Sequence, residues 1–251
     1  RLSALETRMA HYLSASAVSA KNLAEEKDAI KTLIGDISHQ TKTPIANLLL
    51  YAQLLEEQDL PPESREYASA LEHQAEKLRF LIDALVKTSR LESGVLAMTP
   101  KRHGIQQLLD AASAQAAPGA EAKAITLTVE PTDLTARFDP KWTAEALYNL
   151  VDNAVKYTPA GGAVTLRAVG YELFCRVDVT DTGPGIPESE QARIFQRFYR
   201  SPSASEAEGV GIGLYLARQI AAGQGGYLKV SSRPGEGSTF SLFLPRAEER
   251  T

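Results

Sequence analysis

Seven-residue repeats of leucine and isoleucine constrain the fold of this chain more than any other feature. They occur twice in the first part of the sequence. The first repeat contains Leu23, Ile30 and Ile37, with Leu33 between the last two, and the second contains Leu71, Leu78 and Leu85, with Leu81 between the last two. Because this spacing lines up apolar side chains along one seam of a helix, it predicts two long helices. The proline-containing segment 59–64 breaks the pattern between them, so the two helices form an antiparallel hairpin.

This hairpin is expected to need a partner. Two helices alone bury little apolar surface, so pairing with a second copy into a four-helix bundle is the favoured prediction. Packing of the hairpin against the remainder of its own chain is the alternative.

The composition changes near residue 95, and most of the 17 glycines follow this point. Helices are predicted at 105–117, 141–156 and 212–222, and strands at 125–129, 135–138, 163–169, 173–180, 227–231 and 238–244. Turns at 170–171 and 234–237 join two pairs of these strands as hairpins. The mixture predicts an α/β two-layer sandwich rather than a doubly wound parallel sheet.

The composition also excludes several classes of protein. With 43% hydrophobic and 23% charged residues the 251-residue chain should fold, and its net charge of −4 argues against a nucleic-acid surface. No apolar stretch approaches the ~20 residues of a membrane helix. The single cysteine, Cys175, lies in an apolar run and is expected to be a buried thiol, and the four histidines show no metal-ligand spacing.

One histidine stands out by its place on the first helix. His39 follows Ile37 by two residues, about 200° around the helix from the seam, so it should face solvent. Pro44 lacks a backbone donor and should clash with the carbonyl of Gln40, which predicts a bend beside the imidazole.

Two glycine-rich loops in the second half are suited to a ligand. The segment 181–187 follows a predicted strand; its glycines let a ligand approach the backbone, and Asp181 can accept a hydrogen bond. Gly209, Gly211 and Gly213 open a helix, whose N-terminal N–H groups and dipole suit a phosphate. The sequence has neither a Rossmann fingerprint nor the Gly-Lys pair of a P-loop.

A helix predicted over 145–159 has one polar and one apolar face. Glu145, Asn149, Asn153 and Lys156 share the polar face. Such a face is either simply the solvated side of the helix or a ligand site. Since Mg²⁺ prefers oxygen ligands, an oxygen-rich face that ends in lysine can hold Mg²⁺ and a polyphosphate.

In this order, the motifs resemble the boxes of the sensor histidine kinases of two-component signalling. The resemblance covers about 21–245, with a histidine box at His39, an N box at 145–159, glycine boxes at 181–185 and 209–213, and an F box at 194–200. It implies a helical extension over 1–20, a dimerising phosphotransfer hairpin over 21–94 and a catalytic ATP-binding domain over 95–251. That domain would have the Bergerat fold shared with Hsp90-type and gyrase-type ATPases.

The resemblance further implies a role for each box. His39 attacks the γ-phosphate of ATP and passes the phosphoryl group to an aspartate of a response regulator. Asn153 ligates Mg²⁺, and Asp181 accepts a hydrogen bond from the adenine amino group. The remaining implied contacts are Asn149 and Lys156 near the phosphates, Tyr157 against the adenine, Gly183 and Gly185 beside the base, Gly209, Gly211 and Gly213 around phosphate, residues 199–208 as a lid, and Arg197 or Arg200 at the γ-phosphate.

The chain departs from the family pattern directly after the phosphorylated histidine. The family usually has Glu or Asp there to take or orient the imidazole proton, but this chain has Gln40. An amide cannot act as a base, although it can hydrogen-bond the second ring nitrogen. Thr43 matches the position that helps to align water for dephosphorylation of the regulator, so we expect a slow kinase with intact phosphatase activity.

The leading interpretation is therefore a dimeric, ATP- and Mg²⁺-dependent protein histidine kinase with no nucleic-acid partner. The chain starts at Arg1 within a helical pattern. An upstream part is therefore expected to be missing. The family resemblance implies that this part contains the sensor and a transmembrane region, and that the present chain is the cytoplasmic portion of a membrane-anchored parent. Two alternatives remain: a non-catalytic ATP-sensing scaffold, motivated by Gln40, and an Hsp90-like or gyrase-like ATPase, against which the histidine on a seven-residue repeat argues.

Overall fold

The computed structural model describes residues 2–92, 98–201 and 210–246, apart from some side chains of the long helices. The chain forms two compact units, Arg1–Leu96 and Ala97–Thr251. Helix α1 (Leu2–Glu56) runs without a break past residue 20, so the separate role predicted for 1–20 stays a prediction. Within the described parts of the chain, no helix is both long and apolar enough to cross a membrane.

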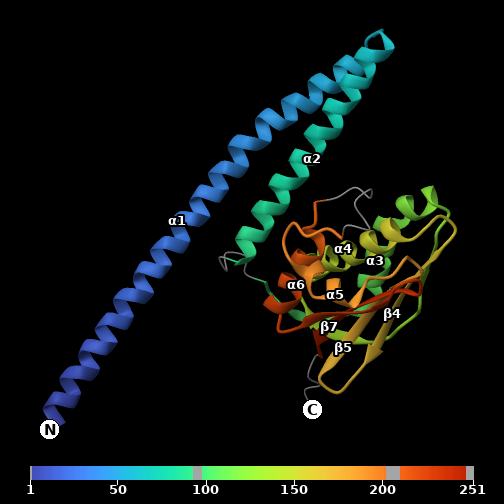
Figure 1. Ribbon diagram of the computed structural model, residues 1–251. Coiled ribbons are helices and arrows are strands. Elements are labelled where there is room, and N and C mark those ends of the chain that lie inside the picture. The colour runs from blue at the N-terminus through green and yellow to red at the C-terminus, as the bar shows by residue number, and fades with distance from the viewer. Residues whose placement is uncertain (1, 93–97, 202–209, 247–251) are drawn as a thin grey trace. The chain divides into compact units, whose positions relative to one another are not determined.

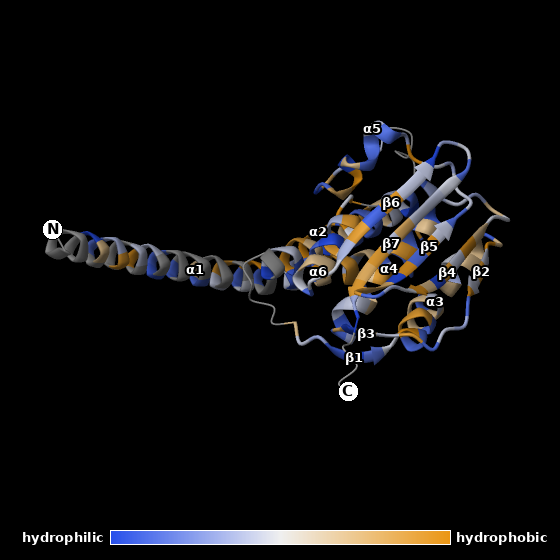
Figure 2. Ribbon diagram, turned by 90° about the horizontal axis from the view of Figure 1, so that it is seen from below, coloured by the Kyte–Doolittle hydropathy of each residue, from blue (hydrophilic) through white to orange (hydrophobic). Residues whose placement is uncertain are grey.

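The first unit is the helical hairpin that the repeats predicted. Helix α2 (Pro62–Glu92) follows α1 after a short connection and begins at a proline, as is common for a first helical residue. Lys42 Nζ lies 3.0 Å from a carboxylate oxygen of Asp83, and Gln53 donates to Glu72 at 3.2 Å, as antiparallel helices require. Helix α1 continues through Pro44, so the proline does not end it. Figure 2 shows polar and apolar residues interleaved along α1.

Among the described residues, the hairpin has a buried cluster that contains no member of the seven-residue repeats. This cluster contains Ile45, Leu49 and Ala75, with Ile82 packed against it. Those members of the repeats that are exposed in the described structure are Leu33, Ile37, Leu71, Leu78 and Leu85. The hairpin therefore presents an apolar surface beyond its own contact, while the four-helix bundle stays a prediction.

The second unit contains a mixed five-stranded sheet with the order β2-β4-β5-β7-β6. Its strands are β2 (Thr126–Val129), β4 (Ala163–Gly170), β5 (Phe174–Asp181), β6 (Tyr227–Arg233) and β7 (Gly237–Pro245). The two predicted hairpins are present as the antiparallel pairs β4–β5 and β6–β7, whereas β2 pairs with β4 in parallel. Alternate apolar residues of β5 and β7 are buried, so one face of the sheet forms the core.

Three helices cover that face and complete the two-layer sandwich: α3 (Ile105–Ala122), α4 (Pro140–Tyr157) and α6 (Gly213–Gly223) (Figure 1). The core contains fully buried side chains from both layers, among them Leu109, Leu147, Ile220, Val177 and Leu242. Cys175 is also buried, as predicted, and burial raises the pKa of its thiol to about 11. The predicted α/β two-layer sandwich is therefore confirmed.

Three short elements were not predicted. Strand β1 (Lys101–Gly104) pairs antiparallel with β3 (Thr135–Phe138) in a separate two-stranded sheet. A single helical turn, α5 (Glu188–Gln191), and a 3-10 turn over Arg193–Phe195 follow the first glycine loop.

A polar network fixes the start of α4. Asp139 is the N-cap, and its Oδ1 accepts from the backbone N–H of Lys141 at 3.1 Å and of Trp142 at 3.2 Å. Its Oδ2 accepts from the N–H of Thr99 at 3.0 Å. The buried amide of Gln224, just after α6, accepts from the backbone N–H of Asp139. One carboxylate thus joins the start of α4 to the first described residues of the unit.

Replacing Asp139 with alanine is expected to lower the free energy of unfolding by about 1–2 kcal/mol at neutral pH, because α4 loses its cap. Burial raises the pKa of Asp139, but its hydrogen bonds to Thr99, Trp142 and Lys141 lower it more, so it lies below the ordinary 3.8. The carboxylate therefore stabilises the folded state above the unfolded-state pKa, and this contribution is lost as the pH falls through the lower folded-state pKa.

Urea unfolding of the wild type and Asp139→Ala at neutral and acidic pH measures this effect. Asp133→Ala, in an exposed loop, is the control and should change little. A difference between wild type and Asp139→Ala that stays constant on acidification would contradict the assignment.

Candidate active site

Helix α4 presents a polar face above its apolar one, as its sequence predicted. Glu145, Asn149, Asn153 and Lys156 are all partly exposed. The opposite face, Leu147, Leu150, Val151 and Val155, is at most 5% exposed. The amide of Asn149 donates to the carbonyl of Glu145 at 2.8 Å, which fixes its rotamer along the helix. This polar face is one wall of the candidate site.

Asp181, the last residue of β5, lies where α4 ends. Its Oδ1 accepts from the N–H of Gly183 at 2.8 Å and of Ser238 at 3.2 Å. Because both donors meet the same oxygen, the carboxylate can offer its other oxygen to a ligand. Burial raises the pKa of Asp181, and the two hydrogen bonds oppose this shift. The side chain is thus a buried, oriented acceptor.

The first glycine loop needs its glycines for two different reasons. A Cβ on Gly183 would lie 2.8 Å from Asp181 Oδ1 and 3.2 Å from the carbonyl oxygen of Tyr157, so this residue lets β5 and α4 approach each other. Gly185 has a φ of +73°, and a Cβ there would collide with the backbone of Arg233 and Pro234. The loop is therefore closely packed against both α4 and the β6–β7 turn.

Gly185→Ala is expected to weaken nucleotide binding by at least about 10-fold and to lower the free energy of unfolding by more than ~2 kcal/mol, because the new Cβ meets immovable backbone. Gly235→Ala is the matched control, since Gly235 also has a left-handed φ, +84°, but nothing within 4 Å of the added Cβ. The control should show only the cost of the backbone conformation, about 1 kcal/mol. Thermal unfolding and ADP titration of both variants measure these effects, and equal losses in the two would contradict the steric account.

The second glycine box contacts both α4 and the F box. At Gly213, the first residue of α6, a Cβ would lie 2.8 Å from Asn149 Oδ1. Gly211 has a φ of +73°, and a Cβ there would meet the carbonyl oxygen of Tyr199 at 2.5 Å. Gly209, the third predicted glycine, lies outside the described residues. The described glycines thus permit close approach between three segments of the site.

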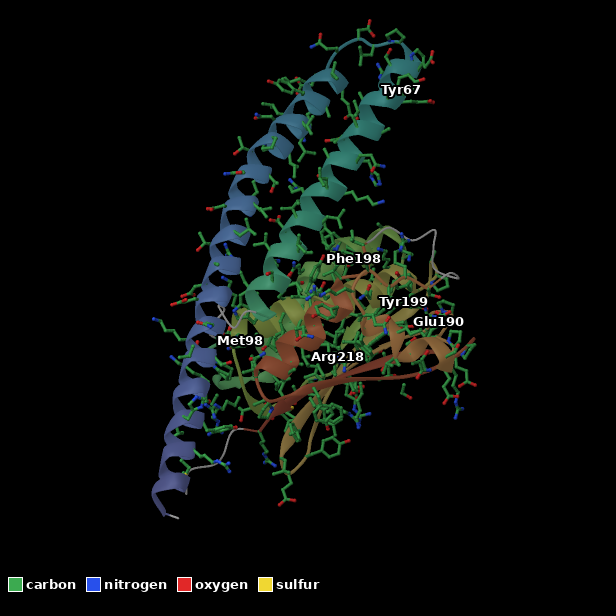
Figure 3. All side chains as sticks on the ribbon, turned by 60° about the vertical axis from the view of Figure 1, so that its left-hand side comes forward. Tyr67, Met98, Glu190, Phe198, Tyr199 and Arg218 are labelled. Carbon is green, nitrogen blue, oxygen red and sulfur yellow. The ribbon has the colours of Figure 1, made fainter. Side chains whose placement is uncertain are left out.

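The F box, 194–200, begins within the 3-10 turn and ends near α4. Phe198 and Tyr199, labelled in Figure 3, belong to it, and the N–H of Phe198 donates to the carbonyl of Gly211 at 2.9 Å. Arg197 Nη2 donates to the hydroxyl of Tyr215 at 3.2 Å. Burial raises the pKa of Tyr157, while the positive charge of Arg200 opposes this rise, so Arg200 lies near the end of α4. The structure therefore brings the N box, both glycine boxes and the F box together.

The predicted acceptor residues lie in the other unit, on α1. The backbone of His39 is helical, but its side chain lies outside the described residues. Gln40 and Thr43 are exposed, and Thr43 is four residues after His39, which places both on one face of the helix.

Sequence reasoning missed one member of the polar face. Asp152 accepts a hydrogen bond from Tyr148 and interacts with the charge of Lys156. Residues 148, 152 and 156 are four apart, so the i, i+4 spacing was the available signal. Among the described residues there is no cluster of three or more His, Cys, Asp or Glu residues able to hold a metal ion.

Two family models match the two units in turn. Residues 29–94 match the His Kinase A (phospho-acceptor) domain, and residues 138–248 match the Histidine kinase-, DNA gyrase B-, and HSP90-like ATPase family. The chain belongs to the histidine kinases. It contains both catalytic parts of this family, the phospho-acceptor hairpin and the ATP-binding domain.

Individual relatives agree with this assignment. The chain is 34% identical over 239 residues to Sensor protein DivL of Caulobacter vibrioides, an alignment that covers 94% of this chain and 31% of DivL. ShkA, solved in complex with AMPPNP, is similar with a TM-score of 0.73 and 29% identity over 88% of this chain and 47% of that one. ThkA, solved in complex with the response regulator TrrA, shares the fold, with a TM-score of 0.62 and 20% identity over 88% of this chain and 64% of that one. This histidine kinase chain therefore spans about a third of the length of DivL.

Proposed function

We propose that this kinase transfers the γ-phosphoryl group of ATP to His39 and then to an aspartate of a response regulator, which it also dephosphorylates. The observation that carries the proposal is the close approach of Asp181, Gly183 and the end of α4: a Cβ on Gly183 would lie 2.8 Å from Asp181 Oδ1 and 3.2 Å from the carbonyl oxygen of Tyr157. An acceptor for a base thereby lies beside a helix face suited to phosphates.

The base-binding end of the site is the part with Asp181. Its carboxylate accepts from the adenine amino group, and the lack of side chains at Gly183 and Gly185 makes room for the ring. Tyr157 packs against the base. This assignment is supported by the burial of Asp181 and by the two N–H groups that fix its orientation.

The phosphate-binding end is formed by the polar face of α4 and by the start of α6. Lys156 and Asn149 lie near the phosphates, and the N–H groups that follow Gly209, Gly211 and Gly213 bind them. Either Arg197 or Arg200 reaches the γ-phosphate. The partial exposure of the α4 residues supports this, because a ligand can reach them. Most of the lid predicted over 199–208 lies outside the described residues.

Mg²⁺ fits this site through Asn153. The ion usually keeps several waters and takes one or two protein ligands together with phosphate oxygens, so a single amide oxygen is a suitable donor. When bound, the ion neutralises charge that develops on the transferred phosphoryl group. The absence of an acidic cluster among the described residues supports a phosphate-dependent ion rather than one held by protein alone.

At the acceptor, a ring nitrogen of His39 forms a bond to the γ-phosphorus as the bond to the bridging oxygen breaks and ADP leaves. The imidazole proton is lost to solvent. Gln40 holds the second ring nitrogen by a hydrogen bond but removes no proton. Because neutral imidazole is the major form near pH 7, the reaction proceeds slowly rather than not at all. Thr43 aligns water for dephosphorylation of the regulator.

The partners follow from the two units. A second copy of the hairpin covers the exposed leucines of the repeats, and the receiver domain of a response regulator docks beside His39. The solved complex of ThkA with TrrA supports a partner of this class. The parent protein is membrane-anchored with this portion in the cytoplasm, as the family resemblance implies, and no nucleic acid is involved.

Incubation with ATP tests the proposed function. With Mg²⁺ and ATP, intact-mass measurement is expected to show one added phosphoryl group per chain, removed again by adding the cognate receiver domain. Omission of Mg²⁺ by chelation should prevent the addition. A folded chain that binds ATP but never gains a phosphoryl group would instead support the ATP-sensing scaffold.

A further inference from the structure

The carboxyl end of α4 carries Lys156 and Tyr157, so its position sets the geometry of the nucleotide site. The last carbonyl groups of a helix have no partner within the helix and need donors from elsewhere. Here the carbonyl of Ala154 accepts from both the N–H and the hydroxyl of Thr158. The carbonyls that follow are satisfied by a residue outside the boxes.

That residue is Lys123. Its ammonium group donates to three carbonyl oxygens, those of Val155 at 2.9 Å, Lys156 at 2.8 Å and Thr158 at 2.6 Å. An ammonium group has three N–H donors, so all of them are used. The positive charge also lies at the negative end of the α4 dipole. The remaining carbonyl, that of Tyr157, is the one beside Gly183.

The backbone conformation at the end of α3 orients the side chain of Lys123 toward this end of α4. Lys123 is the C-cap of α3, and the next residue, Ala124, has a left-handed φ of +51°. The N–H of Ile125 then donates back to the carbonyl of Ala120 at 2.8 Å, which closes the helix end. Helices α3 and α4 lie side by side on the sheet (Figure 1), and a Cβ on Gly119 would lie 3.6 Å from Val155.

Lys123 also holds the loop that follows α4. Its backbone carbonyl accepts from the N–H of Gly161 at 3.0 Å. A Cβ on Gly162, the next residue, would meet the side chains of Thr158 and Thr182, and Thr182 directly follows Asp181. One lysine therefore contacts both the end of α4 and the loop that packs beside Asp181.

We propose that Lys123 is a positioning residue for the nucleotide site: by holding three carbonyls at the end of α4, it places Lys156 and Tyr157 against the first glycine box. The inference rests on the proposed function of that site. Lys123 contacts backbone rather than nucleotide, so it acts only through α4. A misplacement of about 1 Å at a binding group can cost as much as 100-fold in rate.

ADP titration of Lys123→Met tests the proposal. We expect affinity at least roughly 10-fold weaker than in the wild type, in a protein that still unfolds cooperatively. The control Lys101→Met removes an exposed lysine of β1 in the same unit and should bind as the wild type. If Lys123→Met does not fold, the ADP affinity of Lys123→Gln, which keeps two N–H donors, tests the proposal instead.

A double-mutant cycle with Lys156→Ala separates positioning from general stability. If Lys123 acts through α4, its substitution should cost much less affinity when Lys156 is already alanine. Fully additive losses, or wild-type affinity in Lys123→Met or its substitute, would overturn the proposal. A wild type that binds no nucleotide would overturn the proposed function itself, so the two failures are distinguishable.

Discussion

Asp181→Asn is expected to reduce ATP affinity by roughly 5- to 150-fold while the domain stays folded. The N–H groups of Gly183 and Ser238 require an acceptor, so the amide oxygen of asparagine will face them. The amide NH₂ group then faces the proposed adenine amino group, and a donor meets a donor. An unsatisfied buried donor costs about 1–3 kcal/mol, which corresponds to this loss.

The matched control for this substitution is Asp178→Asn on the same strand. Asp178 forms an ion pair with Arg176 at 2.9 Å and accepts a hydrogen bond from Ser241 at 2.6 Å. Because Asp178 precedes Asp181 by three residues, its side chain lies on the opposite side of β5. Nucleotide titration should show wild-type affinity for the control. Equal affinity of Asp181→Asn and wild type would remove Asp181 from the site.

The same carboxylate predicts a pH dependence. Burial raises the pKa of Asp181 above the ordinary 3.8, although its hydrogen bonds act against this. The nucleotide favours the ionised form, so affinity should fall as the pH drops through this raised pKa. The ratio of wild-type to Asp181→Asn affinity cancels the titration of the nucleotide itself and should decrease on acidification.

Gln40→Glu is expected to increase the rate of His39 phosphorylation. A carboxylate beside the imidazole can accept its proton, and general-base catalysis contributes roughly 10²- to 10⁴-fold. The side chain at 40 is exposed, so the charge can be introduced without burial. Single-turnover phosphorylation, with nucleotide affinity measured in parallel, assigns the gain to the transfer step.

Gln74→Glu is a suitable comparison, because it adds the same charge to an exposed site on α2. It should leave the rate of phosphorylation unchanged, and Gln40→Glu should leave dephosphorylation of the regulator close to the wild-type rate. A Gln40→Glu variant that gains phosphate no faster than wild type would contradict the role given to Gln40.

Short-range sequence patterns correctly predicted those helices and hairpins whose formation depends on residues close together in the sequence. The β4–β5 and β6–β7 hairpins and all three core helices carried such signals in their glycine turns and apolar periodicity. Strand β1 carried none, because its residues, Lys-Arg-His-Gly, do not alternate in polarity and its pairing with β3 is a long-range contact. The parallel pairing of β2 with β4 likewise depends on the whole sheet.

The same distinction holds for the site. Asp181 and the glycines were predicted because each belongs to a local motif, and their roles in the site stay predictions. Asp139 before Pro140 was also a local signal, that of a helix N-cap, but the cap was not predicted. Lys123 could not be found, because its three acceptors lie more than thirty residues away. The hairpin contact through Ile45 and Ala75 was also not predicted, because neither residue belongs to the leucine and isoleucine repeats.

The most direct test of the central claim is the location of the phosphoryl group. After incubation with γ-labelled ATP and Mg²⁺, wild type and His73→Ala should carry acid-labile, alkali-stable label, and His39→Ala should carry none. His73 lies exposed on α2 and controls for loss of a histidine from the hairpin. Label that persists in a folded His39→Ala variant would contradict the assignment of His39 as the phosphate acceptor.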